Sequence, residues 1–188
     1  LTRISVLDLV FRFYPLIFSI LLGVGTYCLA LNIFGSKVIG RIAVILSLYF
    51  VYFAGSFGWI ADYLKYKNFG GESTFWANQS ISFNLNPPFA VSLLITIAFL
   101  LIFLSDKKMN RISVISILIL LGGSMIGFKV YAAVLLIGTL IPYAVISLFK
   151  KEFDVFYITV FSAGFSGLIF LSNFEQSQQL TAFAPFWF

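Results

Sequence analysis

Long apolar stretches separated by short charged segments run along almost the whole chain. A helix needs about 20 largely apolar residues to cross a bilayer, at about 1.5 Å per residue. Six stretches approach that length: 13–36, 42–61, 87–104, 112–128, 130–149 and 155–174. Their apolar residues follow one another continuously instead of alternating with polar ones, which excludes a transmembrane β-barrel. The pattern predicts an all-α fold, a polytopic transmembrane helix bundle of about six spans.

The stretch 112–149 is the least regular of these regions. Gly122 and Gly123 interrupt its first half, and Lys129 stands alone between apolar segments. Two arrangements remain open: two spans joined by a turn at Lys129, or one bent or broken helix pair that contains Lys129.

The composition strengthens the membrane interpretation. Apolar and aromatic residues make up 61% of the 188 residues and charged residues 10%, against roughly 45–50% and 25% in soluble domains. We therefore expect a multi-pass integral membrane protein, with the lipid bilayer as its main partner. Residues 1–188 are expected to form one domain of a longer chain. The net charge is +5 without a long Lys/Arg run, so no nucleic-acid partner is expected.

The positions of the basic residues predict the orientation in the membrane. With six spans, seven Lys and Arg fall on one side of the membrane and five on the other. The seven lie in three compact connections, which favours the cytoplasm for that side. They are Lys37, Arg41, Lys107, Lys108, Arg111, Lys150 and Lys151. The outer side receives Arg3, Arg12, Lys65, Lys67, Lys129 and the longest loop, 62–86.

Several kinds of chemistry are excluded by the residue counts. The chain has no histidine and a single cysteine, Cys28, which rules out imidazole catalysis, an internal disulfide and a thiolate metal cluster. We expect no metal site and no cofactor. Seven acidic residues remain for acid–base work.

The outer loop 62–86 combines amide and aromatic side chains, among them Trp76, Asn78, Gln79 and Asn84. Amides bind the hydroxyl edges of sugars, and aromatic rings stack on their C–H faces, so the loop suits a glycan or a lipid headgroup. The alternative is an ordinary interfacial loop, where Trp and Tyr gather anyway. Composition by itself favours that alternative.

The candidate charged groups on the outer side are two carboxylates and two cations. Asp62 and Glu72 are candidate catalytic acids, although such residues are more often solvated loop charges. Lys129 lies in apolar sequence, where a cation snorkels, pairs or faces a polar cavity. Facing a cavity, it would bind a phosphate. Arg12 is either a second phosphate contact or, more simply, an interfacial anchor.

Two further groups of residues are given structural roles. Glu152 and Asp154 lie beside lysines in a short loop and are interpreted as solvated charges. Two glycine pairs, Gly23 with Gly25 and Gly164 with Gly167, are expected to be points of close helix packing.

Two segments resemble the C-type glycosyltransferase (GT-C) superfamily of protein mannosyltransferases and related lipid-linked-sugar transferases. In residues 12–55 an arginine-led span ends in a short "LFG"-like turn with basic residues, and Leu31, Phe34, Gly35, Lys37 and Arg41 fit that pattern. The glycine-rich segment GGSMIGFKVYAAVLLI (122–137) is similar to the superfamily's segment ending in lysine and tyrosine. The loop 75–93 looks like that of uncharacterised bacterial and archaeal membrane proteins of this kind, which implies a prokaryotic plasma membrane.

The resemblance implies transfer of a sugar from a polyprenyl-phosphate donor at the extracytoplasmic face. It implies a lipid-linked sugar as partner, with Lys129 and Arg12 at the phosphate and the amide–aromatic loop at the sugar or acceptor. The superfamily's acidic base lies in an outer loop that would precede this sequence, unless Asp8 is a remnant of that region. Asp8, Asp62 and Glu72 are therefore the candidates for the base. Two alternatives stay open: a segment of a transporter or flippase, and a non-catalytic membrane scaffold.

Overall fold

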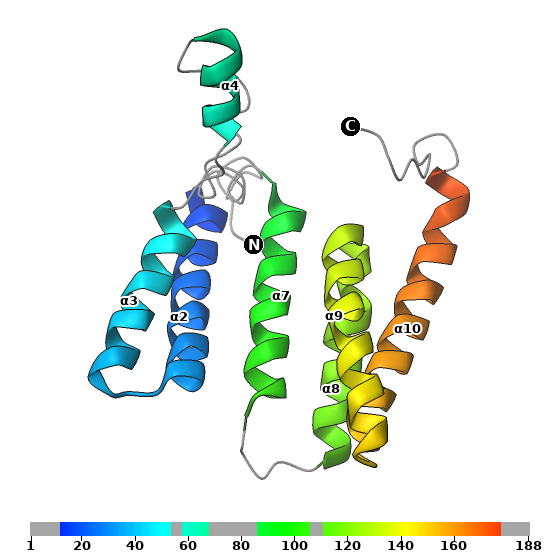
Figure 1. The fold of residues 1–188 in the computed structure, drawn as a ribbon. Helices are drawn as coiled ribbons and strands as arrows, with labels where there is room; N and C mark the ends of the chain where they lie inside the picture. The colour runs from blue at the N-terminus through cyan, green and yellow to red at the C-terminus, as the bar shows by residue number, and fades with distance from the viewer. Residues whose placement is uncertain (1–11, 54–57, 68–85, 106–110, 178–188) are drawn as a thin grey trace, which may run out of the picture. The chain divides into compact units, whose positions relative to one another are not determined.

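The computed structural model describes residues 12–53, 58–67, 86–105 and 111–177, and all its regular elements in these ranges are helices (Figure 1). The all-α prediction is confirmed. In chain order the helices are α2 (Tyr14–Phe34), α3 (Val38–Phe53), α4 (Gly58–Tyr66), α7 (Pro87–Phe103), α8 (Arg111–Ser124), the short 3-10 turn η2 (Met125–Gly127), α9 (Val130–Phe149) and α10 (Phe153–Ser177).

Each of the six predicted apolar stretches overlaps one of the longer helices, α2, α3, α7, α8, α9 or α10. Among the described residues, three helical segments are long and apolar enough to cross a membrane: Tyr14–Phe34, Val130–Phe149 and Phe153–Ser172. The helices α3, α7 and α8 with η2 are apolar but shorter. The chain therefore has the character of a membrane protein.

The boundaries of the second predicted stretch, 42–61, are wrong. The helix α3 begins before it, at Val38, and carries Arg41 in its first turn, while Ala61 belongs to the separate helix α4. A charge is a poor helix boundary, because an arginine near a helix end extends its guanidinium to the headgroups while its backbone stays helical. The first residues of the predicted loop 62–86 are also helical, as the end of α4.

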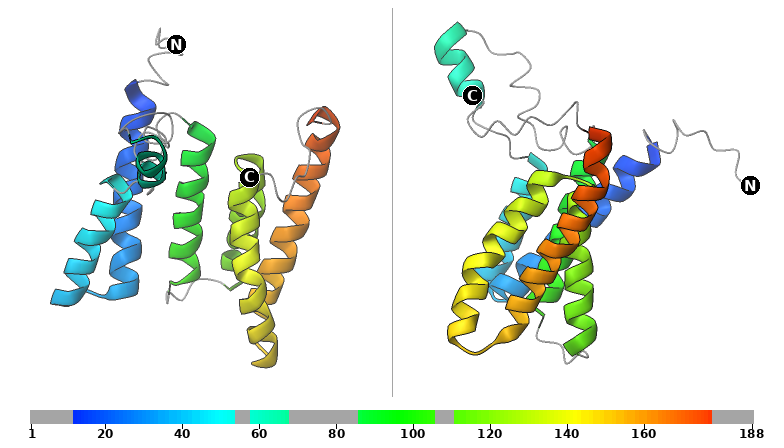
Figure 2. Two further views of the ribbon diagram at one scale, coloured as in Figure 1. Left: turned by 45° about the horizontal axis from the view of Figure 1, so that its top comes forward. Right: turned by 90° about the vertical axis from the view of Figure 1, so that its right-hand side faces the viewer.

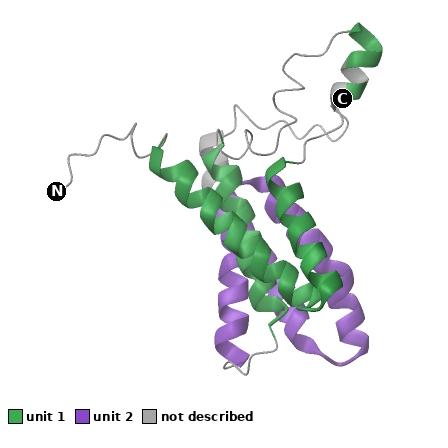
Figure 3. Ribbon diagram, turned by 90° about the vertical axis from the view of Figure 1, so that its left-hand side faces the viewer, with its two compact units in different colours: residues 1–107 green, residues 108–188 purple. Residues whose placement is uncertain are grey.

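The chain divides into two compact units, Leu1–Lys107 and Lys108–Phe188 (Figure 3). In unit 1 the helix α2 packs against both α3 and α7. Its core is formed by Phe18 and Leu22 of α2 with Ala90 of α7. Whether the two units form the expected single domain stays a prediction.

The helices α2 and α7 run parallel and in register. At one end, the Tyr14 hydroxyl donates a hydrogen bond to the carbonyl of Pro87 over 3.2 Å. At the other, the Asn32 amide donates to the carbonyl of Leu104 over 3.4 Å. The helix α3 returns antiparallel beside α2 after a tight turn, as Figure 2 shows. Unit 1 is thus an up–down–up arrangement in which α2 is central.

The prediction of close packing at Gly23 and Gly25 is confirmed. The hydroxyl of Tyr52 on α3 donates to the carbonyl of Ser19 over 2.5 Å and lies 2.3 Å from where a Cβ at Gly23 would stand. A Cβ at Gly25 would lie 2.8 Å from a methyl group of Ile97 on α7. Both distances are too short for a side chain, so glycine lets the two neighbours approach α2.

In unit 2 the central helix is α10, which packs against both α8 and α9. The side chains of Arg111 and Asp154 meet at the starts of α8 and α10. The Ser166 hydroxyl donates a hydrogen bond to the Gly123 carbonyl over 3.1 Å. Gly123 follows Arg111 along α8 by the same number of residues as Ser166 follows Asp154 along α10. These two contacts show that α8 and α10 run parallel. The helix α9, which follows α8 and precedes α10 in the sequence, runs antiparallel to both (Figure 1).

The expected packing points Gly164 and Gly167 are wrong for the described part of the chain. A Cβ at either position would meet no described atom within 4 Å. The close approach involves Gly123 of α8 instead, where an added Cβ would lie 2.3 Å from Cδ1 of Phe165. The glycines of α10 lie on faces that this helix does not turn toward α8 or α9.

Candidate functional site

Lys129 lies at the turn between α8 and α9, at the N-cap position of α9. The 3-10 turn η2 ends α8, and the backbone N–H of Lys129 donates to the carbonyl of Met125 over 3.0 Å. Lys129 then adopts an extended conformation, with φ −149° and ψ 116°, from which α9 starts in the opposite direction. Of the two arrangements that the sequence left open, the structure has two helices joined by a turn.

The Lys129 side chain is half-buried, and its Nζ atom lies 5.5 Å from the centroid of the Tyr131 ring. A cation at this distance is attracted by the face of the ring. The first turn of a helix also presents backbone N–H groups without intrahelical partners and the positive end of the helix dipole. The ammonium group of Lys129 and the start of α9 are therefore both positive, and together they favour the binding of an anion such as a phosphate.

The end of unit 2 that carries Lys129 is opposite to the end that carries its other basic residues. Arg111 begins α8, and Lys150 and Lys151 lie in the turn between α9 and α10. Because α8 and α10 are parallel and α9 is antiparallel, these three residues share one end and Lys129 lies at the other. The orientation predicted from basic residues requires this separation.

Arg12 lies two residues before the start of α2 and is exposed. It belongs to unit 1 and Lys129 to unit 2. A shared phosphate site for these two cations therefore stays a prediction.

The structure describes no side chain for any of the remaining predicted site residues. Asp62 has a helical backbone in α4, but its side chain is outside the described part. The other members lie outside the described residues altogether: Asp8, Glu72, Trp76, Asn78, Gln79 and Asn84. Among the side chains that are described, no group of three or more His, Cys, Asp or Glu is placed to hold a metal ion.

The interpretation of Asp154 as a merely solvated charge is wrong. Its carboxylate accepts two hydrogen bonds from Arg111 Nε, at 3.0 Å and 2.8 Å, and a further one from the same guanidinium. The hydrogen bond to Asp154 and the charge of Asp154 raise the pKa of Arg111. The sequence signal for this pair is weak, because the partners are 43 residues apart and meet only if α8 and α10 are parallel.

Comparison of the chain with protein-family models, with curated protein sequences and with solved structures finds no match.

Proposed function

We propose that the chain is part of a multi-span membrane protein that transfers a sugar from a polyprenyl-phosphate donor at the extracytoplasmic face. The observation that carries the proposal is Lys129, a half-buried cation at the start of α9. It lies in the segment that resembles the C-type glycosyltransferases. A phosphate at this position would balance both the ammonium group and the positive helix end.

The proposal includes six membrane crossings. Besides the three long helices, α3 has 16 residues, α7 has 17, and α8 continues with η2 over Arg111–Gly127. These three segments have lengths of about 24 to 27 Å. A typical hydrocarbon core is about 30 Å thick. The deficit is of a size that snorkelling residues and local thinning of the bilayer accommodate. Lys37 and Arg41, at the start of α3, are suited to that role.

The chemistry assigned to the site is an inverting substitution at the anomeric carbon of the donor. A carboxylate base takes the proton of the acceptor hydroxyl, and the acceptor oxygen forms a bond to the anomeric carbon. The bond from that carbon to the polyprenyl-phosphate oxygen breaks, and the phosphate leaves with the electron pair. Lys129, with Arg12 as the second candidate, would stabilise the charge that develops on the phosphate.

The other roles in this mechanism rest on the resemblance and on composition. The base is one of the three candidate carboxylates, Asp8, Asp62 and Glu72. The sugar or the acceptor would bind the amide and aromatic side chains of the outer loop, for which the candidates are Trp76, Asn78, Gln79 and Asn84.

The alternative, a transporter or flippase segment, is favoured by one observation. Each unit contributes three apolar helices in an up–down–up order, and many transporters consist of two three-helix repeats inserted in opposite orientations. However, the central helix is the first of the three in unit 1 and the last in unit 2. In two related repeats the same helix of the three would be central in both units, so we rank this alternative second.

The experiment is a transfer assay on the full-length protein in liposomes supplied with polyprenyl-phosphate sugars. Lys129→Ala is compared with Lys65→Ala, which removes an exposed lysine that is also predicted on the outer side. We expect Lys129→Ala to lower turnover by about a hundredfold, the usual effect of removing one group that stabilises developing charge. Lys65→Ala should stay near wild type. An active enzyme whose turnover is unaffected by Lys129→Ala would refute the assignment of this lysine.

A further inference from the structure

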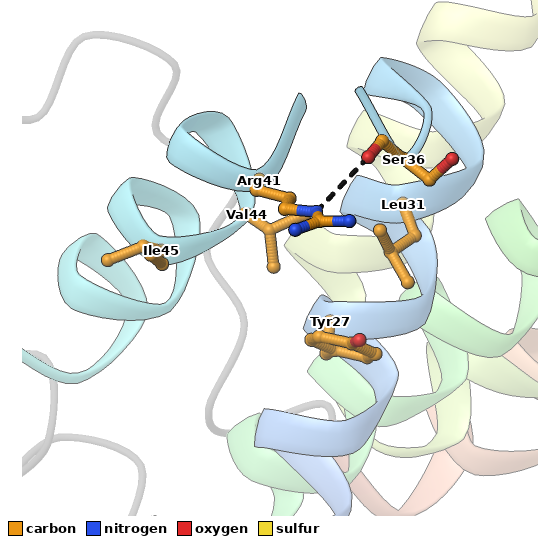
Figure 4. A pocket seen from close by; sticks show the side chains of 6 residues that line it. All are labelled: Tyr27, Leu31, Ser36, Arg41, Val44 and Ile45. Carbon is orange, nitrogen blue, oxygen red and sulfur yellow. Dashed lines mark hydrogen bonds between the residues drawn. The ribbon is translucent and has the colours of Figure 1, made fainter. Parts of the chain in front are cut away.

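A pocket of about 460 Å³ lies between α2 and α3, near the turn that joins them (Figure 4). Its volume is in the range of small-molecule sites, roughly 300 to 1,000 Å³. Most of its lining is apolar, and a single charged side chain projects into it. The lining residues are Tyr27, Leu31, Ser36, Arg41, Val44 and Ile45.

Two glycines shape the turn beside this pocket. Gly35 ends α2 with φ at 74°, a positive value that glycine adopts without strain. A Cβ at Gly40 would lie 2.1 Å from the carbonyl oxygen of Gly35, so only glycine lets α3 begin so close to the end of α2. The tight turn brings Arg41 beside the backbone carbonyl of Ser36.

The Arg41 guanidinium is anchored at one nitrogen and available at the others. Its Nε donates to the Ser36 carbonyl over 3.3 Å, and the rest of the group points across the pocket toward α2 (Figure 4). Residues 12–53, which form the α2–α3 hairpin, contain no Asp or Glu. The charge of Arg41 therefore has no carboxylate partner within the hairpin, and its remaining N–H groups can form the paired hydrogen bonds that suit a phosphate.

Below Arg41 the pocket continues as an apolar groove that opens to the surroundings. It extends from the turn at Ser36 along the last turns of α2, past Leu31 to Tyr27. Its α3 side is formed by Val44, which is buried, and Ile45, whose side chain is 66% exposed. The exposed apolar surface indicates that the groove faces lipid chains, since such a surface is costly in water.

We propose that this pocket is a binding site for an anionic phospholipid, whose phosphate contacts Arg41 and whose acyl chain follows the groove. A soluble phosphate would use the arginine alone, whereas the apolar groove beneath it suits a ligand with a hydrocarbon chain attached to the anion. The predicted orientation assigns this turn to the cytoplasmic face. The inference needs membrane residence but is independent of the proposed sugar transfer.

The test uses the protein in phosphatidylcholine vesicles with a trace of photoactivatable lipid. The probe is either phosphatidylglycerol or phosphatidylcholine with the same photoreactive acyl chain, and the labelled peptides are mapped by mass spectrometry. We expect phosphatidylglycerol to label the segment 27–45 at least about fivefold more than phosphatidylcholine does, because a charge-assisted contact distinguishes the two headgroups. Excess inorganic phosphate should not compete with the lipid probe.

Two variants distinguish a site from diffuse attraction. Arg41→Gln should abolish the headgroup preference, while Lys37→Gln should keep most of it, because Lys37 is exposed in the same turn but does not line the pocket. Ile45→Trp should lower labelling by both lipids, because the indole fills the groove. Equal loss in Arg41→Gln and Lys37→Gln would overturn the proposal in favour of general surface charge. Displacement by inorganic phosphate would overturn it in favour of a soluble anion.

Discussion

The packing of α8 against α10 predicts that alanine substitutions at two glycines of unit 2 change the stability in opposite directions. Alanine is the better helix former by about 1 kcal/mol, so replacing a helical glycine normally stabilises a protein where space allows. Gly164 has that space, since an added Cβ would meet no described atom within 4 Å. A Cβ at Gly123 would lie 2.3 Å from Cδ1 and 2.8 Å from Cβ of Phe165.

The cost at Gly123 can be estimated from these distances. The Phe165 ring can turn away, but its Cβ is fixed to the α10 backbone and cannot. Carbon atoms in contact normally lie about 3.5 to 4.0 Å apart, so α8 and α10 must separate locally by about 0.7 Å. Such overpacking costs about 1 to 3 kcal/mol. The separation also stretches the 3.1 Å hydrogen bond from Ser166 to the Gly123 carbonyl.

The assay is thermal unfolding of the detergent-solubilised protein, followed by circular dichroism. Because both variants gain the same helix propensity, the difference between Gly123→Ala and Gly164→Ala isolates the packing cost of about 1 to 3 kcal/mol. For a chain of this size, that difference separates the two midpoints by at least about 2 °C. Gly164→Ala should have the higher midpoint. A midpoint of Gly123→Ala equal to or above that of Gly164→Ala would mean that α8 and α10 do not approach at Gly123.

Three further predictions concern the ends of the helices in unit 2. Lys151 has a left-handed φ of 61°, so Lys151→Gly should be more stable to heat than Lys151→Ala by about 1 kcal/mol, and equal midpoints would contradict that conformation. Because the Arg111–Asp154 pair is partly exposed, Arg111→Gln should lower the thermal midpoint in low salt and much less in 1 M salt; a salt-independent loss would indicate a role other than ion pairing. In a Cys28→Ala background, an impermeant maleimide should label Lys129→Cys and Lys151→Cys from opposite sides of a sealed membrane, and labelling from the same side would exclude a crossing by α9.

The helices were predictable because burial in a bilayer depends mainly on the length of an apolar run. Each predicted span overlaps a helix, and the prediction fails where a charge is used as a boundary, at Arg41. The packing glycines of α2 were predictable from their spacing, but those of α10 were not. Which glycine faces a neighbour depends on which helix is central in the unit, and residue spacing along one helix does not contain that information.

The candidate site was predictable only in part. Lys129 stood out because a charge between apolar segments is unusual, and the turn at this lysine was one of two arrangements that the sequence allowed. The ion pair of Asp154 with Arg111 and the pocket at Arg41 depend on helices or turns that bring separate residues together. In the sequence, Arg41 and Arg111 are basic residues near the ends of apolar stretches, which is the usual appearance of orientation signals. Asp154, beside two lysines, has the usual appearance of a solvated charge.

The position of Lys129 differs physically from that of two other lysines at helix ends. Lys67 and Lys151 follow the C-terminal ends of α4 and α9, where the negative end of the helix dipole stabilises a cation by about 0.3 to 1 kcal/mol. Lys129 lies at an N-terminal end, where the same dipole is unfavourable to it. Lys37 is also at a helix start, but it is exposed to solvent screening, whereas Lys129 is half-buried. The charge of Lys129 is therefore disfavoured both by the helix dipole and by its partial burial. A bound anion would be attracted by the ammonium group and by the helix start, which is why this lysine carries the proposal of a phosphate-containing donor.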